Sequence, residues 1–319
     1  MAIALGDPAG IGPEIALKAA RDPQVLAIAR PVLFGDPLVL QAHAAASGLS
    51  GDFSTVDHAD AADSGDGVTL VARRQFGPGE LRIGQVAAAH GRSAVDSAKA
   101  AIEAALAGAV DAVIATPQTE TAIQAAGIEF DGYPSFVARC TGVAPEDAFL
   151  MVCFDDRRIA HATLHASIRR ALELITPERV ERVIRTTHAV LRKTGIAAPR
   201  LAVSGVNPHA GENGLFGAEE QTIIGPAIER VRRDGVAVDG PFGADTMFHK
   251  TGYDAFVVML HDQGHIAAKL LARNRTAAMT IGTPIVFCSV AHGSALDIAG
   301  GGVADHRAVV EAVRRVTGR

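Results

Sequence analysis

Three histidines stand in separate polar motifs of this 319-residue chain, and they are the residues best suited to do chemistry. His165 lies in HATLHAS, His209 in VNPHAGE and His261 in MLHDQGH. Each follows an apolar run that predicts a strand, and ligands bind at strand ends in open α/β folds. Neutral imidazole is the commonest transition-metal ligand, and three ligands leave a coordination position for substrate. The sequence therefore predicts a catalytic divalent metal site. Three unrelated polar histidines are the alternative, because the spacing matches no local ligand signature.

Two carboxylates and a lysine complete the predicted catalytic set. Lys269 is the candidate general acid–base, because an amine beside a dication can have a lowered pKa. Its alternative is a surface lysine on an amphipathic helix. Asp245 and Asp262 are candidate carboxylates that orient the ligand histidines.

Two further histidines flank the predicted ligands. His161 and His165 would point to one face of a strand, together with Thr163. His265 would share a helix face with His261 if a helix begins at HDQG. We therefore expect His161 and His265 near the substrate, with a packing histidine as the alternative for His161.

Composition limits the class of protein. Apolar residues make up 48% and charged residues 20%, as in soluble α/β proteins. The net charge is −5, and no run of Lys and Arg is long enough to follow a phosphate backbone. Nucleic acid is therefore not expected as a partner. No stretch is long and apolar enough to span a membrane, and no leader precedes GDPAG, so a cytoplasmic location is expected. The three cysteines form no CxxC and are expected to be free thiols.

Apolar runs alternate with amphipathic stretches along the chain, which predicts a largely parallel sheet covered by helices on both faces. Strands are expected at 2–5, 30–35, 67–72, 111–117, 148–154, 158–165, 200–207, 254–260, 277–282 and 284–290. Helices are expected at 93–108, 177–194, 217–234 and 305–317. The length suits two domains. We place the first at 1–128 plus 286–319 and the second at 129–285.

Two glycine-rich segments are candidate cofactor sites. GDPAGIGPE begins at Gly6, and its exposed amides could hold an anion at a helix start, although an ordinary strand-to-helix turn explains it equally well. HGSALDIAGGGVAD at 292–305 resembles the adenine-binding loop of 3-isopropylmalate dehydrogenase, which implies NAD as cofactor. An Asp at the place of Asp297 would accept hydrogen bonds from the ribose hydroxyls and repel the extra phosphate of NADP. The implied cofactor contacts are Gly12, His292, Gly293, Leu296, Asp297 and Ile298.

The whole chain resembles the 4-hydroxythreonine-4-phosphate dehydrogenase family through GDPAGIGPE, ATP, NPHAGE, GPFGADT, HDQG, Lys269 and HGSALD. The resemblance implies a two-domain α/β/α sandwich like that of isocitrate and isopropylmalate dehydrogenases, with the active site in a cleft between the domains. It also implies that His165, His209 and His261 hold one divalent metal per site, with zinc expected. The family's sites are shared between two subunits, so a homodimer is expected.

The substrate positions depart from that family. Gly132–Ser135 reads GYPS instead of Gly-His-Thr-Glu, and Glu120, Ala278 and Phe287 stand where the family has lysine, asparagine and arginine. Without the arginine, the chain lacks a guanidinium group at this position, and a guanidinium is the group that binds phosphate through two parallel hydrogen bonds. Positive partners for a substrate carboxylate are expected from Lys269, Arg273 and Arg275.

GYPS, ETAI, HATLH, MLHDQGH and KLLA instead resemble terephthalate cis-dihydrodiol dehydrogenase, a branch of the same superfamily. This resemblance implies NAD- and metal-dependent oxidative decarboxylation of an aromatic cis-dihydrodiol carboxylate to a catechol such as protocatechuate. Tyr133, Ser135, His161 and His265 would contact the substrate. The alternatives are 4-phosphohydroxy-L-threonine dehydrogenase, an acyl-phosphate transferase of similar fold, and a non-catalytic metal-binding module.

Overall fold

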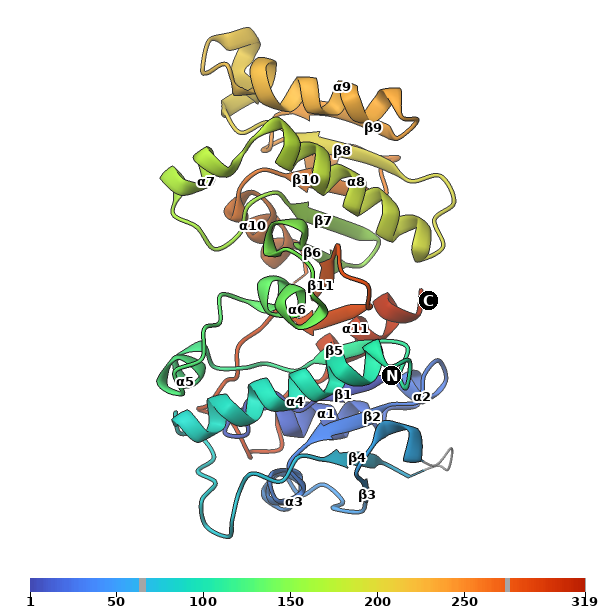
Figure 1. The fold of residues 1–319 in the computed structure, drawn as a ribbon, viewed down its shortest axis with the longest axis vertical. Coiled ribbons are helices and arrows are strands. Elements are labelled where there is room, and N and C mark those ends of the chain that lie inside the picture. Colours follow the sequence, from blue (N-terminus) through green and yellow to red (C-terminus); the bar gives the residue numbers. More distant parts are fainter. Residues whose placement is uncertain (63–66, 273–275, 319) are drawn as a thin grey trace. The chain divides into compact units, whose positions relative to one another are not determined.

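The structure is a computed structural model that describes residues 1–62, 67–272 and 276–318. The chain forms two compact units (Figure 1). The first unit comprises Met1–Gly142 and Pro284–Arg319, and the second comprises Val143–Thr283. The first unit extends past the predicted boundary at residue 128 because it includes α6 (Tyr133–Thr141), whose Phe136 and Val137 are buried in its hydrophobic core.

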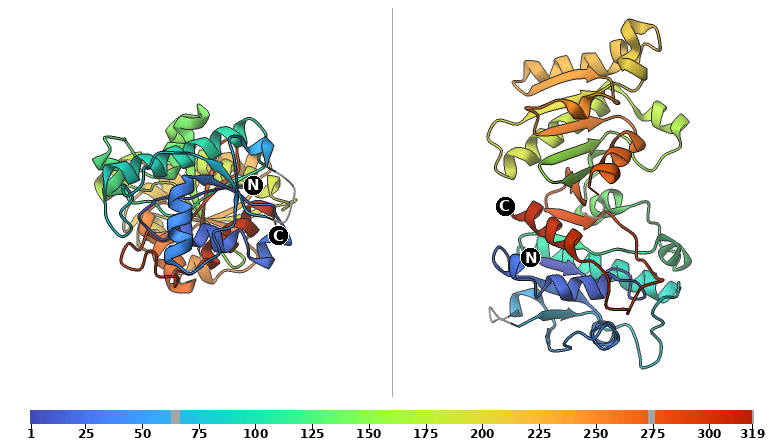
Figure 2. Two further views of the ribbon diagram at one scale, coloured as in Figure 1. Left: turned by 90° about the horizontal axis from the view of Figure 1, so that it is seen from below. Right: turned by 180° about the vertical axis from the view of Figure 1, so that it is seen from behind.

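The first unit is built on a parallel sheet in the order β3-β4-β2-β1-β5-β12. Its strands are β1 (Ala2–Ala4), β2 (Val32–Gly35), β3 (Ser54–Val56), β4 (Thr69–Ala72), β5 (Val113–Ala115) and β12 (Phe287–Val290). Its helices are α1 (Gly12–Ala19), α2 (Pro23–Leu26), α3 (Pro37–Ala46), η1 (Ala59–Ala61), α4 (Ala88–Leu106), α5 (Glu120–Ala125), α6 and α11 (Arg307–Thr317). Helix α4 covers one face of this sheet, and α1 and α11 cover the other (Figures 1 and 2). The central strands are apolar throughout because both faces are buried.

The second unit has the sheet order β11-β6-β7-β10-β8-β9. Its strands are β6 (Phe149–Phe154), β7 (Arg157–His161), β8 (Arg200–Ser204), β9 (Ala237–Phe242), β10 (Ala255–Val258) and β11 (Ala277–Ile281). Its helices are η2 (Pro145–Asp147), α7 (Ile168–Leu174), α8 (Pro177–Lys193), η3 (Pro208–Gly214), the π-helical turn η4 (Glu220–Ile224), α9 (Gly225–Arg233), η5 (Met247–His249) and α10 (His261–Leu271). The predicted alternation of strands and helices is confirmed in both units.

The expectation of a largely parallel sheet is wrong around β6, which pairs antiparallel with both β7 and β11. The connection from β6 to β7 is a tight turn at Asp155 and Asp156, and Asp155 has φ 42°. So short a loop joins antiparallel neighbours, because parallel strands need a crossover of about a dozen residues or more. The letters FDDR between two apolar runs were the signal for this hairpin.

Two strands were missed, the three-residue β3 and the six-residue β9, and both lie at sheet edges. Strand β3 lies in a stretch of the sequence rich in Gly, Ser and Asp, and β9 contains Pro241, which cannot donate to a ladder and is tolerated at an edge. Among the described residues, no helix is long and apolar enough to cross a membrane.

Candidate functional site

Four histidines of the second unit gather where β7 ends and α10 begins. The rings of His261 and His265 stack, with centroids 3.9 Å apart and planes 6° apart. His161, the last residue of β7, has its ring centroid 4.7 Å from that of His265. His165 lies in the loop that follows β7, with its centroid 5.8 Å from that of His261. Helix α10 begins at His261, which meets the condition set in the sequence analysis, so His261 and His265 do share one face of the helix.

A side chain in the first turn of α10 satisfies the backbone amides of the two residues that precede the helix. The Gln263 Oε1 accepts hydrogen bonds from the backbone amides of Met259 and Leu260, each at 2.9 Å. Both amides lie just before His261, the first residue of α10, so these hydrogen bonds tie the start of the helix to the segment that follows β10. The side chain of Gln263 therefore fixes the direction in which α10, and with it His261 and His265, leaves β10.

The partners of the ring nitrogens set the tautomers of this cluster. A carbonyl oxygen can only accept, so His161 Nδ1 donates to Leu150 O at 3.3 Å and its Nε2 is left as an acceptor. His265 Nδ1 donates to His161 Nε2 at 3.1 Å and to His261 O at 3.2 Å. His261 Nδ1 donates to Asp262 Oδ1 at 2.7 Å. His261 and His265 are therefore each left with an Nε2 lone pair.

Burial keeps two of these rings neutral. It lowers the pKa of His161 to about 3, and the neighbouring His265 acts in the same direction. Burial, followed by the charge of His261, lowers the pKa of His265 to about 4. Neutral imidazole is the form that binds a metal or accepts a hydrogen bond. Asp262 orients His261 as a carboxylate partner of a ligand histidine does.

His161, an expected substrate contact, is buried in the interior of the second unit. It is 1% exposed and both its ring nitrogens have partners, so it can act only through His265. The predicted alternation of residues 161, 163 and 165 on one strand face ends at Thr163, whose hydroxyl donates to Met259 O at 2.7 Å. Strand β7 ends at His161, and His165 is an exposed loop residue.

His209 stands on a separate loop after β8, with its ring centroid 6.2 Å from that of Phe216. The backbone from His209 to Asn213 has positive φ at every residue, a left-handed conformation that non-glycine residues rarely adopt. Within the described ranges, no three His, Cys, Asp or Glu side chains are arranged to hold a metal. The donor chemistry fits a divalent metal, and one chain brings together His165 and His261 but does not add His209 to them.

A buried carboxylate that the sequence analysis missed holds the His209 loop. Glu220 is 4% exposed and its Oε1 accepts the amides of Val206 at 2.7 Å and Asn207 at 2.8 Å. Its Oε2 accepts Asn207 Nδ2 at 3.0 Å. A Cβ at Gly211 would come within 2.6 Å of Glu220 Oε2, so glycine is required there. The signal was an acidic residue on the apolar side of a predicted helix.

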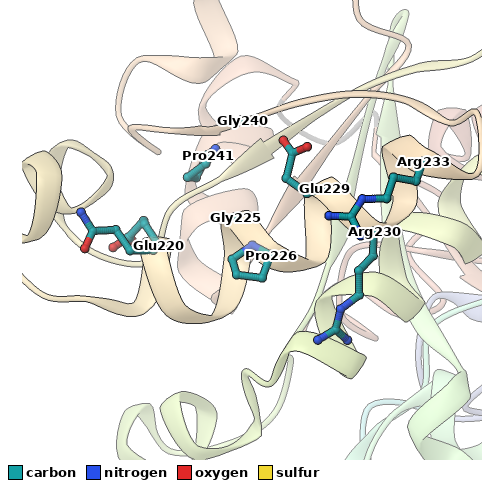
Figure 3. Close-up of a pocket in the computed structure, with 9 residues that line it drawn as sticks. Glu220, Gly225, Pro226, Glu229, Arg230, Arg233, Gly240 and Pro241 are labelled. Carbon is teal, nitrogen blue, oxygen red and sulfur yellow. The ribbon is translucent and has the colours of Figure 1, made fainter.

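Glu220 also borders a cavity of about 590 Å³ beside α9 and β9 (Figure 3). Arg230 and Arg233 line the same cavity. Arg230 pairs with Glu178 at 3.5 Å and with Glu181 at 3.7 Å. The cavity includes none of the predicted site residues.

The remaining predicted catalytic residues, Asp245 and Lys269, are exposed and lie near different histidines. Asp245 is exposed and lies beside the His209 loop, since a Cβ at Gly243 would be 2.8 Å from Asp245 Oδ1 and 3.7 Å from His209 Cα. Lys269 is exposed on α10, and its charge contributes to the lowered pKa of His265. Arg273 and Arg275 lie outside the described residues.

The first unit holds the predicted cofactor loop at 292–305 by a buried ion pair. Glu14 is fully buried and accepts from Lys18 Nζ at 2.7 Å and from the Ala304 amide at 2.9 Å. Lys18 also donates to the carbonyls of Gly302 and Ala304, both at 2.9 Å. A Cβ at Gly10 would come 2.7 Å from Ser294 Cβ. The motif GDPAGIGPE thus anchors the second glycine-rich loop, a role that the sequence analysis did not foresee.

The predicted cofactor residues are distributed over this loop and α1. Gly12 is buried, and a Cβ there would meet Leu5 O at 2.3 Å, so this glycine lets α1 approach β1. Gly293, Asp297 and Ile298 are exposed on the loop, and His292 and Leu296 are partly buried.

The predicted substrate residues of α6 lie in an aromatic cluster. Tyr133 packs against Phe287 with ring centroids 4.9 Å apart and has Phe130 and Phe136 as further neighbours. Burial raises the pKa of its hydroxyl, which donates to Thr116 O at 3.4 Å. Ser135 lies in the first turn of the same helix and is partly buried.

Comparison with known proteins gives the family. The family described as "Pyridoxal phosphate biosynthetic protein PdxA" matches residues 27–316. The chain is 43% identical to the 1,2-dihydroxy-3,5-cyclohexadiene-1,4-dicarboxylate dehydrogenase of Comamonas sp, over 98% of this chain and 95% of that protein. The chain therefore belongs to the PdxA family, whose named relatives here are dehydrogenases.

Two solved structures extend the likeness to the whole fold. A terephthalate 1,2-cis-dihydrodiol dehydrogenase from Burkholderia xenovorans is 42% identical, covering 99% of this chain and 97% of that one, with a TM-score of 0.71. A 4-hydroxythreonine-4-phosphate dehydrogenase from Klebsiella pneumoniae is 35% identical, covering 100% and 99%, with a TM-score of 0.88. The predicted resemblance to both branches is confirmed.

Proposed function

We propose that this protein is an NAD- and divalent-metal-dependent dehydrogenase that oxidises and decarboxylates an aromatic cis-dihydrodiol carboxylate. The observation that carries the proposal is the cluster in which His165 and His261 approach each other while His265 stacks on His261. The likeness to two proteins named as dehydrogenases of such diols supports the choice of substrate class.

Two uncharged side chains at positions where the family binds phosphate support an unphosphorylated substrate. The two positions that correspond by resemblance to the family's asparagine and arginine are Ala278, 7% exposed, and Phe287, 0% exposed. Phe287 packs against Tyr133 in the core of the first unit. A phenyl ring offers a phosphate neither positive charge nor hydrogen-bond donors.

The chemistry can be divided between the substrate and the chain's own residues. The diol carbon loses a hydride, which NAD⁺ takes up, and its hydroxyl loses a proton; the resulting β-keto acid loses carbon dioxide and tautomerises to a catechol. A divalent metal, which would be held by His165, His209 and His261, supplies positive charge beside the substrate oxygens. Asp262 fixes the tautomer of His261, and Lys269 Nζ receives or returns the proton. Asp245, which lies beside the His209 loop, would orient His209 as a carboxylate partner.

The metal site would be completed by a second copy of the chain. His209 is not grouped with His165 and His261 within one described chain, and its loop carries the exposed side chains of Leu215 (72% exposed) and Phe216 (48% exposed). Apolar side chains of this size favour burial against a partner. We propose a homodimer in which the His209 loop of one subunit completes the site of the other, with zinc as the metal.

The test follows NADH formation and carbon dioxide release with the purified homogeneous protein. The terephthalate-derived cis-dihydrodiol should be oxidised with release of carbon dioxide, and a chelator should abolish the rate until a divalent metal is restored. Turnover of 4-phosphohydroxy-L-threonine with none of the diol would replace the proposal by the second candidate, which the TM-score of 0.88 to the Klebsiella pneumoniae structure favours. Rates that are unaffected by complete removal of metal would exclude the metal-dependent mechanism.

A further inference from the structure

The parallel sheet of the first unit has a topological switch point at β1, where the order of the strands reverses. From β1 the chain continues outward to β2 and then to the β3–β4 pair, whereas β5 and β12 lie on the other side of β1 (Figure 1). In open α/β sheets, ligands bind outside the carboxyl ends of the strands at such a switch point. The residues that leave β1, β5 and β12 at this edge are therefore candidates for a binding site.

Four side chains at this edge carry polar atoms that are buried and have no hydrogen-bond partner in the described part of the chain. They are Asp7 Oδ2, Thr116 Oγ1, both amide atoms of Gln118, and His292 Nε2. Asp7 is 1% exposed and Thr116 is 0% exposed. An unpaired polar atom in the interior is costly, so several at one strand edge point to a missing ligand.

Backbone and side-chain hydrogen bonds join these segments at one edge. The amide of Asp7 donates to Pro117 O at 2.8 Å, which places Asp7 beside the residues that leave β5. The Thr119 hydroxyl donates to Ser294 Oγ at 2.9 Å, which joins the same segment to the loop after β12. The unpaired atoms therefore come from three neighbouring strand ends of one unit.

The unpaired atoms specify the chemistry of a ligand. Asp7 Oδ2 can only accept, and Asp7 forms no ion pair with any described residue. His292 Nδ1 is 3.2 Å from Gly293 O and so donates, which leaves Nε2 as an acceptor. Gln118 can both donate and accept. A phosphate or carboxylate would be repelled by Asp7, whereas a cationic ring that bears a carboxamide would satisfy the set.

We infer that Asp7 and Gln118 bind the nicotinamide end of the dinucleotide. Gln118 pairs with the carboxamide, and Asp7 places its negative charge beside the oxidised ring, which is a cation and becomes neutral on reduction. This inference rests on the proposed use of NAD. Asp7 thereby favours binding of NAD⁺ over NADH, whereas Asp297, on the exposed loop, is expected to contact only the adenosine end.

Calorimetric binding of three ligands to the purified protein tests the inference. ADP-ribose shares the adenosine end and both phosphates but lacks nicotinamide. Asp7→Asn keeps the size and removes the charge, so its affinity for NAD⁺ should fall about tenfold while its affinities for NADH and ADP-ribose stay near those of the wild type. Gln118→Leu should weaken NAD⁺ and NADH about equally and leave ADP-ribose unchanged. Asp60→Asn, an exposed carboxylate of the same unit, is the control for loss of one charge.

The outcomes separate the inference from the proposed function. Wild-type protein that binds neither NAD⁺ nor ADP-ribose would refute the use of NAD itself. Wild-type protein that binds both, with Asp7→Asn and Asp60→Asn equal in NAD⁺ affinity, would overturn the role of Asp7. If Asp7→Asn does not fold, Gln118→Leu decides, because Gln118 is only partly buried.

Discussion

The imidazole of His265 lies flat on that of His261 and donates its Nδ1 proton to His161, so one buried histidine orients a second one beside a predicted metal ligand. Gly264 makes this arrangement possible, because it lies where a side chain would strike the His161 ring. The stacked pair and its hydrogen bond link the end of β7 to the first turns of α10.

Gly264→Ala should disrupt the histidine cluster. Its Cβ would lie 2.3 Å from His161 Nε2 and 2.8 Å from Ile159 Cγ2, so the His161–His265 hydrogen bond must break or α10 must shift. Overpacking of this kind costs about 1–3 kcal/mol. We expect lower thermal stability and a lower kcat, measured by calorimetry and by the NADH assay. Gly67→Ala, where the new Cβ meets nothing within 4 Å, is the matched control. A Gly264→Ala enzyme with unchanged kcat would show that this hydrogen bond is not needed.

Glu220→Gln should loosen the His209 loop. The new side-chain NH2 of glutamine would face the side-chain NH2 of Asn207, which now donates a hydrogen bond to Glu220 Oε2. The variant loses that bond, and a hydrogen bond to a charged group contributes about 1.5–3 kcal/mol. We expect destabilisation of about that size in urea denaturation and weaker retention of metal on dialysis. Glu229→Gln removes an exposed carboxylate of the same unit and should change both quantities little. Equal metal retention in the two variants would rule out a positioning role for Glu220.

Two inactive variants should restore activity when they are combined. In a mixed dimer of His209→Ala and His261→Ala subunits, one site receives an intact His165 and His261 from the first subunit and an intact His209 from the second. Co-expression should therefore recover activity that neither variant has alone. The pair His165→Ala and His261→Ala, whose residues lie in one cluster, should not recover it. No recovery in the first mixture would show that each chain assembles its own site.

The buried pair Glu14–Lys18 should make the cofactor loop sensitive to acid. Burial by itself would raise the pKa of Glu14, but hydrogen bonds from Lys18, the Ala304 amide and Ser47, together with the charge of Lys18, hold it below its ordinary value of 4.5. Because the folded pKa is the lower one, this stabilisation is fully present above pH 4.5 and is lost as the pH falls through the folded pKa. Urea midpoints of the wild type should fall more steeply below that pH than those of Glu14→Gln. Parallel curves would contradict the prediction.

Tyr133→Phe distinguishes packing from substrate contact. If Tyr133 serves the aromatic cluster, the variant should keep its stability within about 1 kcal/mol, since the hydroxyl makes one long hydrogen bond to Thr116 O. Its kcat/KM should also stay near that of the wild type. Tyr133→Ala should cost about 3 kcal/mol through the cavity beside Phe287. A large loss of kcat/KM in Tyr133→Phe alone would restore the predicted contact between the hydroxyl and the substrate.

The sequence was sufficient for most of the elements and insufficient for their pairing. Periodicity predicted the apolar strands of both units, because burial leaves a local signal, whereas a helix at HDQG was only a condition for the shared face of His261 and His265. The antiparallel pairing of β6 with β7 was missed, because strand direction depends on the short turn at Asp155 and Asp156, and periodicity takes no account of turn length. Edge strand β9 was hidden by Pro241, because Pro is rare in strands.

The candidate site shows the same limit. The shared helix face of His261 and His265 followed from their spacing of four residues, whereas the burial of His161 depends on the pairing of β7 with β6 and on the approach of α10. Glu14 and Glu220 escaped notice because an acidic residue in a helix is usually solvated, and only tertiary contacts show that these two are buried.

The second unit is inserted into the sequence of the first, and this insertion determines which unit can finish folding first during synthesis. Strand β12 and helix α11 belong to that unit, yet they are synthesised after the whole of Val143–Thr283. The N-terminal segment therefore emerges without the strand that flanks β5, and it must wait, incomplete, while the inserted unit folds. Translation that stops before Pro284 would yield a complete second unit attached to a first unit that lacks β12 and α11. The edge of β5 would then be exposed and prone to aggregation.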